Sequence, residues 1–128
     1  MRLLLDTHAL MWALAGSSRL SRAARDAIAS TDNEILVSAA SAMEVATKVR
    51  LGKLPEAELL ARDFDDALSA ADYLALPVSV AHAAHAGRLN IPHRDPFDRL
   101  LIAQAQIENV PLVSNEALFD TFGVDRLW

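Results

Sequence analysis

The chain has 128 residues, of which 52% are hydrophobic and 23% charged, a balance that excludes a disordered protein and predicts one globular domain over residues 1–128. It contains no cysteine, which excludes a disulfide framework and thiolate chemistry. No apolar run approaches the ~18–20 residues of a membrane span and the N-terminus is too short and polar for a signal peptide, so we expect a cytoplasmic protein that contacts no membrane.

Strand-like and helix-like segments alternate through the first half of the chain. Residues 2–5 have the pattern of a short buried strand, and a helix is expected from Asp6-Thr7 to residue 15. A second helix, capped by Ser21, follows to residue 30. Residues 34–37 are the next strand, and the helix after it, residues 40–51, ends at Gly52.

The second half continues the alternation. One long helix is expected over residues 56–71, then a strand at 73–76 and an alanine-rich helix at 79–88. Asp95 suits an N-cap and Pro96 the first helical position, which predicts a helix from there to residue 109. A strand at 110–113, a short helix at 117–122 and a final segment complete the chain. The alternation predicts an α/β fold of three layers, a central and mostly parallel sheet flanked by helices.

Polar side chains follow three of the predicted strands, and further acids lie in the helices next to them. Asp6 directly follows the first strand, and Ser38 and Ser114 directly follow later strands. Because the carboxyl ends of parallel strands share one edge, which is where ligands bind in open α/β sheets, we expect that edge to collect a set of acids. They are Asp6, Glu44, Asp95, Asp98 and Glu116.

Carboxylates this close repel one another unless a cation neutralises them. Oxygen ligands favour Mg²⁺ or Mn²⁺, and a metal-bound water near a phosphate becomes a nucleophile. The residues therefore indicate phosphodiester hydrolysis. The net charge of −5 makes the chain a poor general nucleic-acid binder, so metal ions, a local basic patch or a second chain would have to offset the repulsion.

Each residue also has a simpler interpretation. Asp6 suits a plain N-cap, and acids in a first helical turn are ordinary helix electrostatics. Glu44 and Lys48 are spaced as a helical ion pair. His82, His85 and His93 raise the alternative of a zinc site, but no cysteine or suitably spaced acid completes four ligands, so packed or surface histidines are the better interpretation.

Four stretches, in this order, together resemble the PIN-domain ribonucleases and, within them, the VapC-type toxins of bacterial toxin–antitoxin pairs. They are Leu5-Asp6-Thr7-His8 with Trp12; Val37-Ser38-Ala39-Ala40-Ser41 through Glu44 and Lys48 to Leu51-Gly52-Lys53-Leu54; His93-Arg94-Asp95-Pro96-Phe97-Asp98-Arg99; and Leu112-Val113-Ser114 with Phe119.

The resemblance implies a PIN fold and a Mg²⁺-dependent endoribonuclease, with Mn²⁺ as a possible substitute. The family's acids fall on Asp6, Glu44 and Asp98, and its fourth acid, usually Asp, falls on Glu116. Asp95 is an additional acid. All five are candidate metal ligands, and Asp6, Glu44, Asp98 and Glu116 are the candidate catalytic residues. The residues expected to contact substrate are Thr7, Lys48 and Ser114.

The resemblance also implies a cognate antitoxin that blocks the enzyme, and a homodimer. Expected contact surfaces are the helix from Glu56, Met11 and Trp12 on the first helix, and an apolar face made of Ala42, Val45, Ala46 and Val49. An antitoxin arginine could enter the acidic site in place of metal.

Three other functions remain as alternatives. A phosphoacceptor receiver domain needs paired acids after the first strand and a late lysine, which this sequence lacks. A catalytically silent PIN domain would be a binding module. A PIN nuclease of RNA processing or DNA-flap cleavage is disfavoured by the small size of the chain, which leaves no room for an accessory domain.

Overall fold

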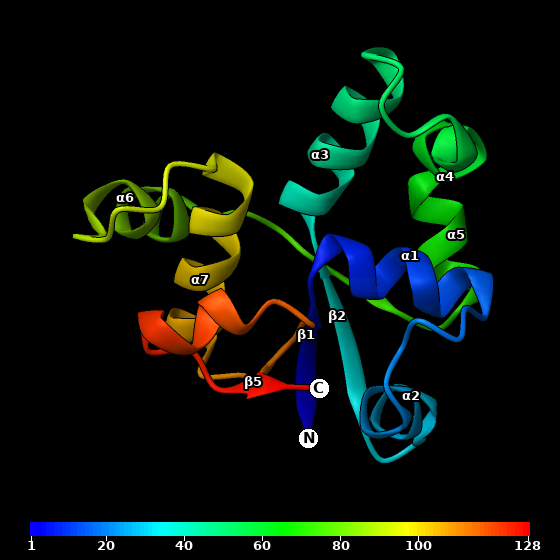
Figure 1. Cartoon of the computed structure of the whole chain (residues 1–128), viewed down its shortest axis with the longest axis horizontal. Coiled ribbons are helices and arrows are strands. Elements are labelled where there is room, and N and C mark those ends of the chain that lie inside the picture. Colours follow the sequence, from blue (N-terminus) through cyan, green and yellow to red (C-terminus); the bar gives the residue numbers. More distant parts are fainter.

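The fold is a sheet of short strands joined by helices (Figure 1), and the computed structural model describes residues 1–128. The elements are β1 (Arg2–Leu5), α1 (Thr7–Ala15), α2 (Arg22–Ala29), β2 (Glu34–Ser38), α3 (Ala39–Arg50), η1 (Pro55–Ala57), α4 (Glu58–Arg62), α5 (Phe64–Ala70), β3 (Leu74–Leu76), α6 (Val80–Arg88), α7 (Pro96–Glu108), β4 (Leu112–Val113), η2 (Ala117–Phe122) and β5 (Arg126–Leu127), where η marks a 3₁₀-helix.

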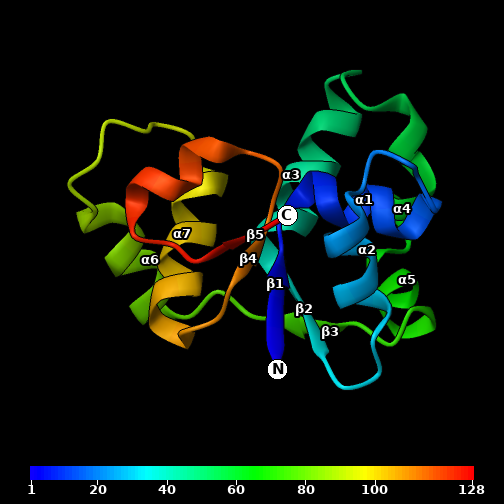
Figure 2. The same cartoon turned by 60° about the horizontal axis from the view of Figure 1, so that its bottom comes forward.

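The sheet has five strands in the order β3-β2-β1-β4-β5. Every neighbouring pair is parallel, including Leu5 opposite Val37 and Leu5 opposite Val113. Figures 1 and 2 show α1, α2 and α5 to one side of the sheet and α6 and α7 to the other. The predicted three-layer α/β fold is confirmed, and the sheet is parallel throughout rather than mostly parallel.

Alternation along β1 divides the core into two halves. Leu3 and Leu5 belong to a cluster with residues of α1, α2 and α5, whereas Leu4 belongs to a second cluster with residues of α7. Successive strand residues point to opposite faces, and here both faces are covered by helices. The apolar run Leu3-Leu4-Leu5 is therefore completely buried.

Polar caps begin the helices that border the sheet edge. Asp6 accepts a hydrogen bond from the Ala9 N–H, and Ser38 accepts one from the Ala40 N–H. Asp95 caps α7, where Pro96 takes the first position. These side chains satisfy N–H groups that have no partner within the helix. The caps predicted at Asp6 and Asp95 are confirmed.

The prediction of one helix over residues 56–71 is wrong. The segment is divided into η1, α4 and α5, and the break lies at Asp63, which has φ −128° and ψ 50°. Aspartate is a poor helix former because its side chain competes for backbone hydrogen bonds, and Asp65 and Asp66 then fall in the first turn of α5, where the helix dipole favours acids. The break also lets Phe64 and Leu68 pack against the first core cluster, whereas α4 has no buried residue.

The final segment forms a strand that the sequence did not predict. After the left-handed turn at Gly123, with φ 71°, β5 pairs with β4 at the sheet edge. Trp128 then lies against Trp12, with ring centroids 5.9 Å apart, and His8 stacks on the same indole at 5.6 Å. Trp12 is thus half-buried between the core and two other rings.

Candidate active site

The predicted sheet edge brings the first acid and two serines together. Asp6, Ser38 and Ser114 stand at the carboxyl ends of the adjacent strands β1, β2 and β4. The Asp6 N–H donates to the carbonyl of Val113 at 3.0 Å, so strand pairing itself places Asp6 beside Ser114. Both serines and Asp6 are buried. The shared edge is therefore a property of the sheet, as the alternation of elements predicted.

Asp6 is an aspartate whose charge is disfavoured by its surroundings. Its side chain is nearly inaccessible, with the residue 5% exposed, and Oδ1 accepts from the Ala9 N–H at 2.8 Å. Burial raises the pKa of Asp6 to about 6, and the charge of Glu116 adds to the rise. The Ser114 hydroxyl, the Ala9 N–H and the His8 charge oppose it. A bound cation would remove this penalty by stabilising the carboxylate.

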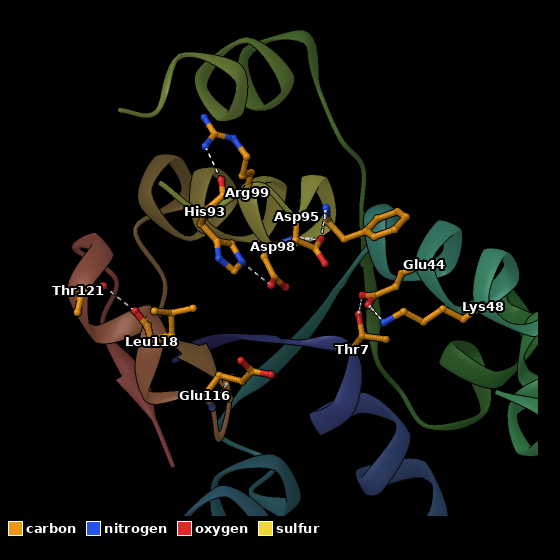
Figure 3. A network of polar contacts seen from close by, with 12 residues as sticks. Thr7, Glu44, Lys48, His93, Asp95, Asp98, Arg99, Glu116, Leu118 and Thr121 are labelled. Atoms are coloured by element: carbon orange, nitrogen blue, oxygen red, sulfur yellow. Dashed lines mark hydrogen bonds and ion pairs between the residues drawn. The ribbon is translucent and has the colours of Figure 1, made fainter. Parts of the chain in front are cut away.

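Glu44 is held on α3 by a chain of hydroxyls and a lysine (Figure 3). The Thr7 hydroxyl donates to Glu44 Oε1 at 2.6 Å, and Ser41 Oγ lies 3.0 Å from Thr7 Oγ1. A hydroxyl carries one proton, so Ser41 donates to Thr7. Lys48 Nζ pairs with Glu44 Oε2, and the predicted ion pair is confirmed.

Lys48 brings a positive charge to these acids. Burial lowers the pKa of Lys48, but the hydrogen bond and charge of Glu44 outweigh it, and the charges of Asp95 and Asp98 raise it further. The net pKa lies above the ordinary lysine value. Lys48 is therefore an ammonium group at neutral pH, within the field of acids from both α3 and α7.

Asp98 projects from the first turn of α7 beside the cap Asp95. Asp95 Oδ1 accepts from the Phe97 and Asp98 N–H groups at 2.9 and 3.2 Å, and His93 Nε2 lies 2.7 Å from Asp98 Oδ2. Burial raises the pKa of Asp98, as do the charges of Asp95 and Glu44, while the His93 hydrogen bond lowers it. Charges on α3 and α7 therefore act on one another across the site.

Glu116 is the most exposed of the five acids. Its backbone N–H donates to Ser114 Oγ at 3.0 Å at the start of η2, and its carboxylate has no hydrogen-bonded partner. Figure 3 shows the Glu116 and Asp98 carboxylates directed into the same space, with Glu44 and Thr7 at its other side. The structure thus brings all five predicted acids to one end of the sheet.

The donor set fits a hard divalent cation by its chemistry, because the buried acids offer only oxygen and repel one another without a cation. In the present conformation no group of three or more His, Cys, Asp or Glu side chains is close enough to hold an ion. Glu44 pairs with Lys48, and Asp98 contacts His93 through Oδ2, while Asp98 Oδ1 has no hydrogen-bonded partner. The metal-ligand assignment of the five acids stays a prediction.

The three histidines occupy separate places. His82 pairs with Glu108 at 3.0 Å, His85 lies 2.7 Å from Gln106, and only His93 reaches the acids. Sequence reasoning left His93 without a role. Its position two residues before the Asp95 cap could have indicated that it lies near the site. Its contact with Asp98, however, depends on the path of the loop before α7.

Comparison with known proteins agrees with the fold. The model of the PIN domain family matches residues 3–124. No curated protein matches the sequence. No helix of the structure has the length and apolar character needed to cross a membrane.

Solved structures share the fold at low sequence identity. VapBC2 from Rickettsia felis, solved bound to a DNA fragment from the promoter, is 18% identical with a TM-score of 0.71, and the match covers 100% of both chains. DNA-bound VapBC from Salmonella typhimurium is 16% identical with a TM-score of 0.68, covering 98% of this chain and 96% of that one. A toxin–antitoxin complex from Klebsiella pneumoniae is 18% identical with a TM-score of 0.66, covering 97% and 94%. Since the family match spans almost the whole chain and the fold agrees with it, the chain belongs to the PIN-domain family.

Proposed function

We propose that the chain is a metal-dependent endoribonuclease of the VapC type, the toxin of a toxin–antitoxin pair. The observation that carries this is the set of acids at the sheet edge, where burial and neighbouring negative charge raise the pKa of both Asp6 and Asp98. Such an arrangement costs stability in the isolated chain, which indicates that the acids are kept for a ligand. The resemblance to VapC ribonucleases supports RNA as the substrate, and the toxin–antitoxin complexes among the structures of the same fold support the role of a toxin.

Asp6, Glu44 and Asp98 would hold Mg²⁺ or Mn²⁺, and Asp95 and Glu116 stand beside them. When bound, such an ion supplies Lewis acidity toward a phosphate oxygen and toward the attacking water. Lys48 contributes a permanent positive charge among the acids, suited to a substrate phosphate. Thr7 orients Glu44 through its 2.6 Å hydrogen bond, so we assign it a positioning role in addition to the predicted contact with substrate.

The test is cleavage of a labelled single-stranded RNA by the purified chain. We expect cleavage with Mg²⁺ or Mn²⁺, arrest by EDTA and recovery when the metal is restored. A DNA strand of the same sequence should remain intact. Cleavage that survives EDTA would contradict the metal-dependent reaction. Absence of cleavage over a broad set of RNAs would favour the alternative of a silent PIN binding module.

We further propose a homodimer and a cognate antitoxin as partners in the cytoplasm. Of the predicted apolar face, Val45 is completely buried in the core, so it is unavailable for contact. The exposed apolar residues of this region are instead Met43, Leu51 and Leu59, which are 65%, 52% and 74% exposed. Sedimentation at tens of micromolar should show a dimer, as expected for a Kd in the micromolar range or below. A strict monomer at that concentration would contradict the dimer.

A further inference from the structure

A single guanidinium organises the loop that leads into α7. All of its nitrogens donate to backbone carbonyls, and no carboxylate is among its hydrogen-bonded partners. Arg99 contacts the carbonyls of Ala86 (Nε, 3.0 Å), Gly87 (Nη2, 3.4 Å), Leu89 (Nη2, 2.7 Å), Ile91 (Nη1, 3.4 Å) and His93 (Nη1, 2.8 Å). Arginine carries five N–H donors in a fixed plane, so one side chain can bind several carbonyls together.

These carbonyls lack ordinary partners. Ala86 and Gly87 lie in the last turn of α6, where carbonyls have no N–H ahead of them within the helix and where a cation is favoured by the helix dipole. The segment between α6 and α7 contains no helix or strand. Arg99 therefore supplies to this segment the hydrogen bonds that regular structure would otherwise provide.

The same loop delivers a side chain to the acidic site. Arg99 Nη1 binds the carbonyl of His93, while the His93 ring lies 2.7 Å from Asp98 Oδ2 (Figure 3). The ring also packs against Phe122, with centroids 5.7 Å apart. Asp98 and Arg99, neighbours on α7, thus hold the same histidine, one at its ring and the other at its backbone.

We propose that Arg99 is a positioning residue for the acidic site. By fixing the backbone of His93, it holds the imidazole against Asp98 and so sets the direction of that carboxylate. The inference rests on the proposed function, since it concerns Asp98 as a metal ligand. Groups that orient a ligating carboxylate typically change metal affinity or activity by ~10–100-fold when they are removed.

The first experiment does not depend on metal or on activity. In the full chain, nuclear Overhauser contacts between the His93 and Phe122 rings report where the imidazole sits. We expect them in the wild type and in Arg62→Lys, a matched control whose arginine pairs with Glu58 on the exposed face of α4. We expect them to disappear in Arg99→Lys, because an ammonium cannot reach carbonyls spread around a planar guanidinium. Unchanged contacts in Arg99→Lys would overturn the proposal.

The second experiment measures the consequence at the site as Mn²⁺ affinity by calorimetry. Arg99→Lys and His93→Ala should each weaken binding by ~10–100-fold. The double variant should bind Mn²⁺ no more weakly than His93→Ala alone, since Arg99 acts on the ion through His93. It should nevertheless unfold at a lower temperature than His93→Ala, because it also lacks the hydrogen bonds of Arg99 to the loop. Additive losses of affinity would instead indicate a general structural role for Arg99 and overturn the proposal.

Two controls keep these outcomes distinct. If Arg99→Lys does not fold, unchanged Mn²⁺ affinity in His93→Ala alone overturns the proposal, because no route from Arg99 to the ion would remain. If the wild type binds no Mn²⁺ and cleaves no RNA, the proposed function fails, and the ring contacts alone decide whether Arg99 positions His93.

Discussion

Asp6→Asn is expected to stabilise the folded chain at pH 8 while it abolishes RNA cleavage. The pKa of Asp6 rises from 3.8 to about 6 on folding, because its burial disfavours the charged form. Between these values the folded state retains a proton that the unfolded state releases, so stability falls as pH rises. From about pH 7 upward the penalty has its full value of about 3 kcal/mol, which the neutral asparagine avoids.

The measurement is urea unfolding of both proteins from pH 3 to pH 8 with EDTA present. The gain from Asp6→Asn should be largest at pH 8 and vanish toward pH 3, below both pKa values, where Asp6 is protonated in the folded and the unfolded state. Asp32→Asn, an exposed aspartate in the turn before β2, is the matched control and should not change the profile. Added Mg²⁺ should narrow the difference by stabilising only the wild type. Equal stability at pH 8 would contradict the burial penalty.

Asp98→Asn is expected to reduce RNA cleavage by more than ~100-fold, since loss of a ligand exceeds the ~10–100-fold effect of the groups around it. Its fold should persist, because Asp95, and not Asp98, caps α7. Glu116→Gln is the matched comparison. The carboxylate of Glu116 is exposed and has no hydrogen-bonded partner. The substitution should therefore weaken metal affinity but leave measurable cleavage.

Initial rates at saturating and limiting Mg²⁺, together with thermal unfolding of each variant, separate an effect on metal affinity from an effect on the fold. Full activity in a folded Asp98→Asn variant would refute its assignment. A loss in Glu116→Gln as severe as that in Asp98→Asn would show that the glutamate is an essential ligand.

Lys48→Met should lose more activity than stability if the ammonium group of Lys48 binds a substrate phosphate. Equal losses of activity and stability would leave Lys48 only the ion pair with Glu44.

Local patterns accounted for most of the fold. The apolar run of residues 3–5, the caps Asp6 and Asp95 and the proline after the second cap all act within one helical turn or one strand, so they can be read without knowledge of the rest of the chain. Where such signals were weak the prediction failed. The break at Asp63 serves the packing of Phe64 and Leu68 on the core, a requirement that no local pattern expresses.

The strand β5 is a second feature that no local pattern predicts. Two residues, Arg126 and Leu127, are too few to carry an alternating pattern, and they become a strand because β4 presents an unpaired edge to them. The pairing depends on a partner elsewhere in the sequence, which no reading of residues 123–128 alone contains.

The site likewise has features that follow from the sequence and features that depend on the packed chain. Sequence alone determined which acids meet, because strand order in a parallel α/β fold places Asp6 and the helix starts at one edge. The pair of Glu44 with Lys48 followed from their spacing on one helix. Only the tertiary structure decided the other contacts: Glu44 accepts a hydrogen bond from Thr7, and Asp98 lies against His93. These contacts depend on distances of a few ångströms between separate elements, and such distances follow from how helices pack and how one arginine gathers a loop. Burial, which raises the pKa of Asp6, is likewise a property of the packed chain.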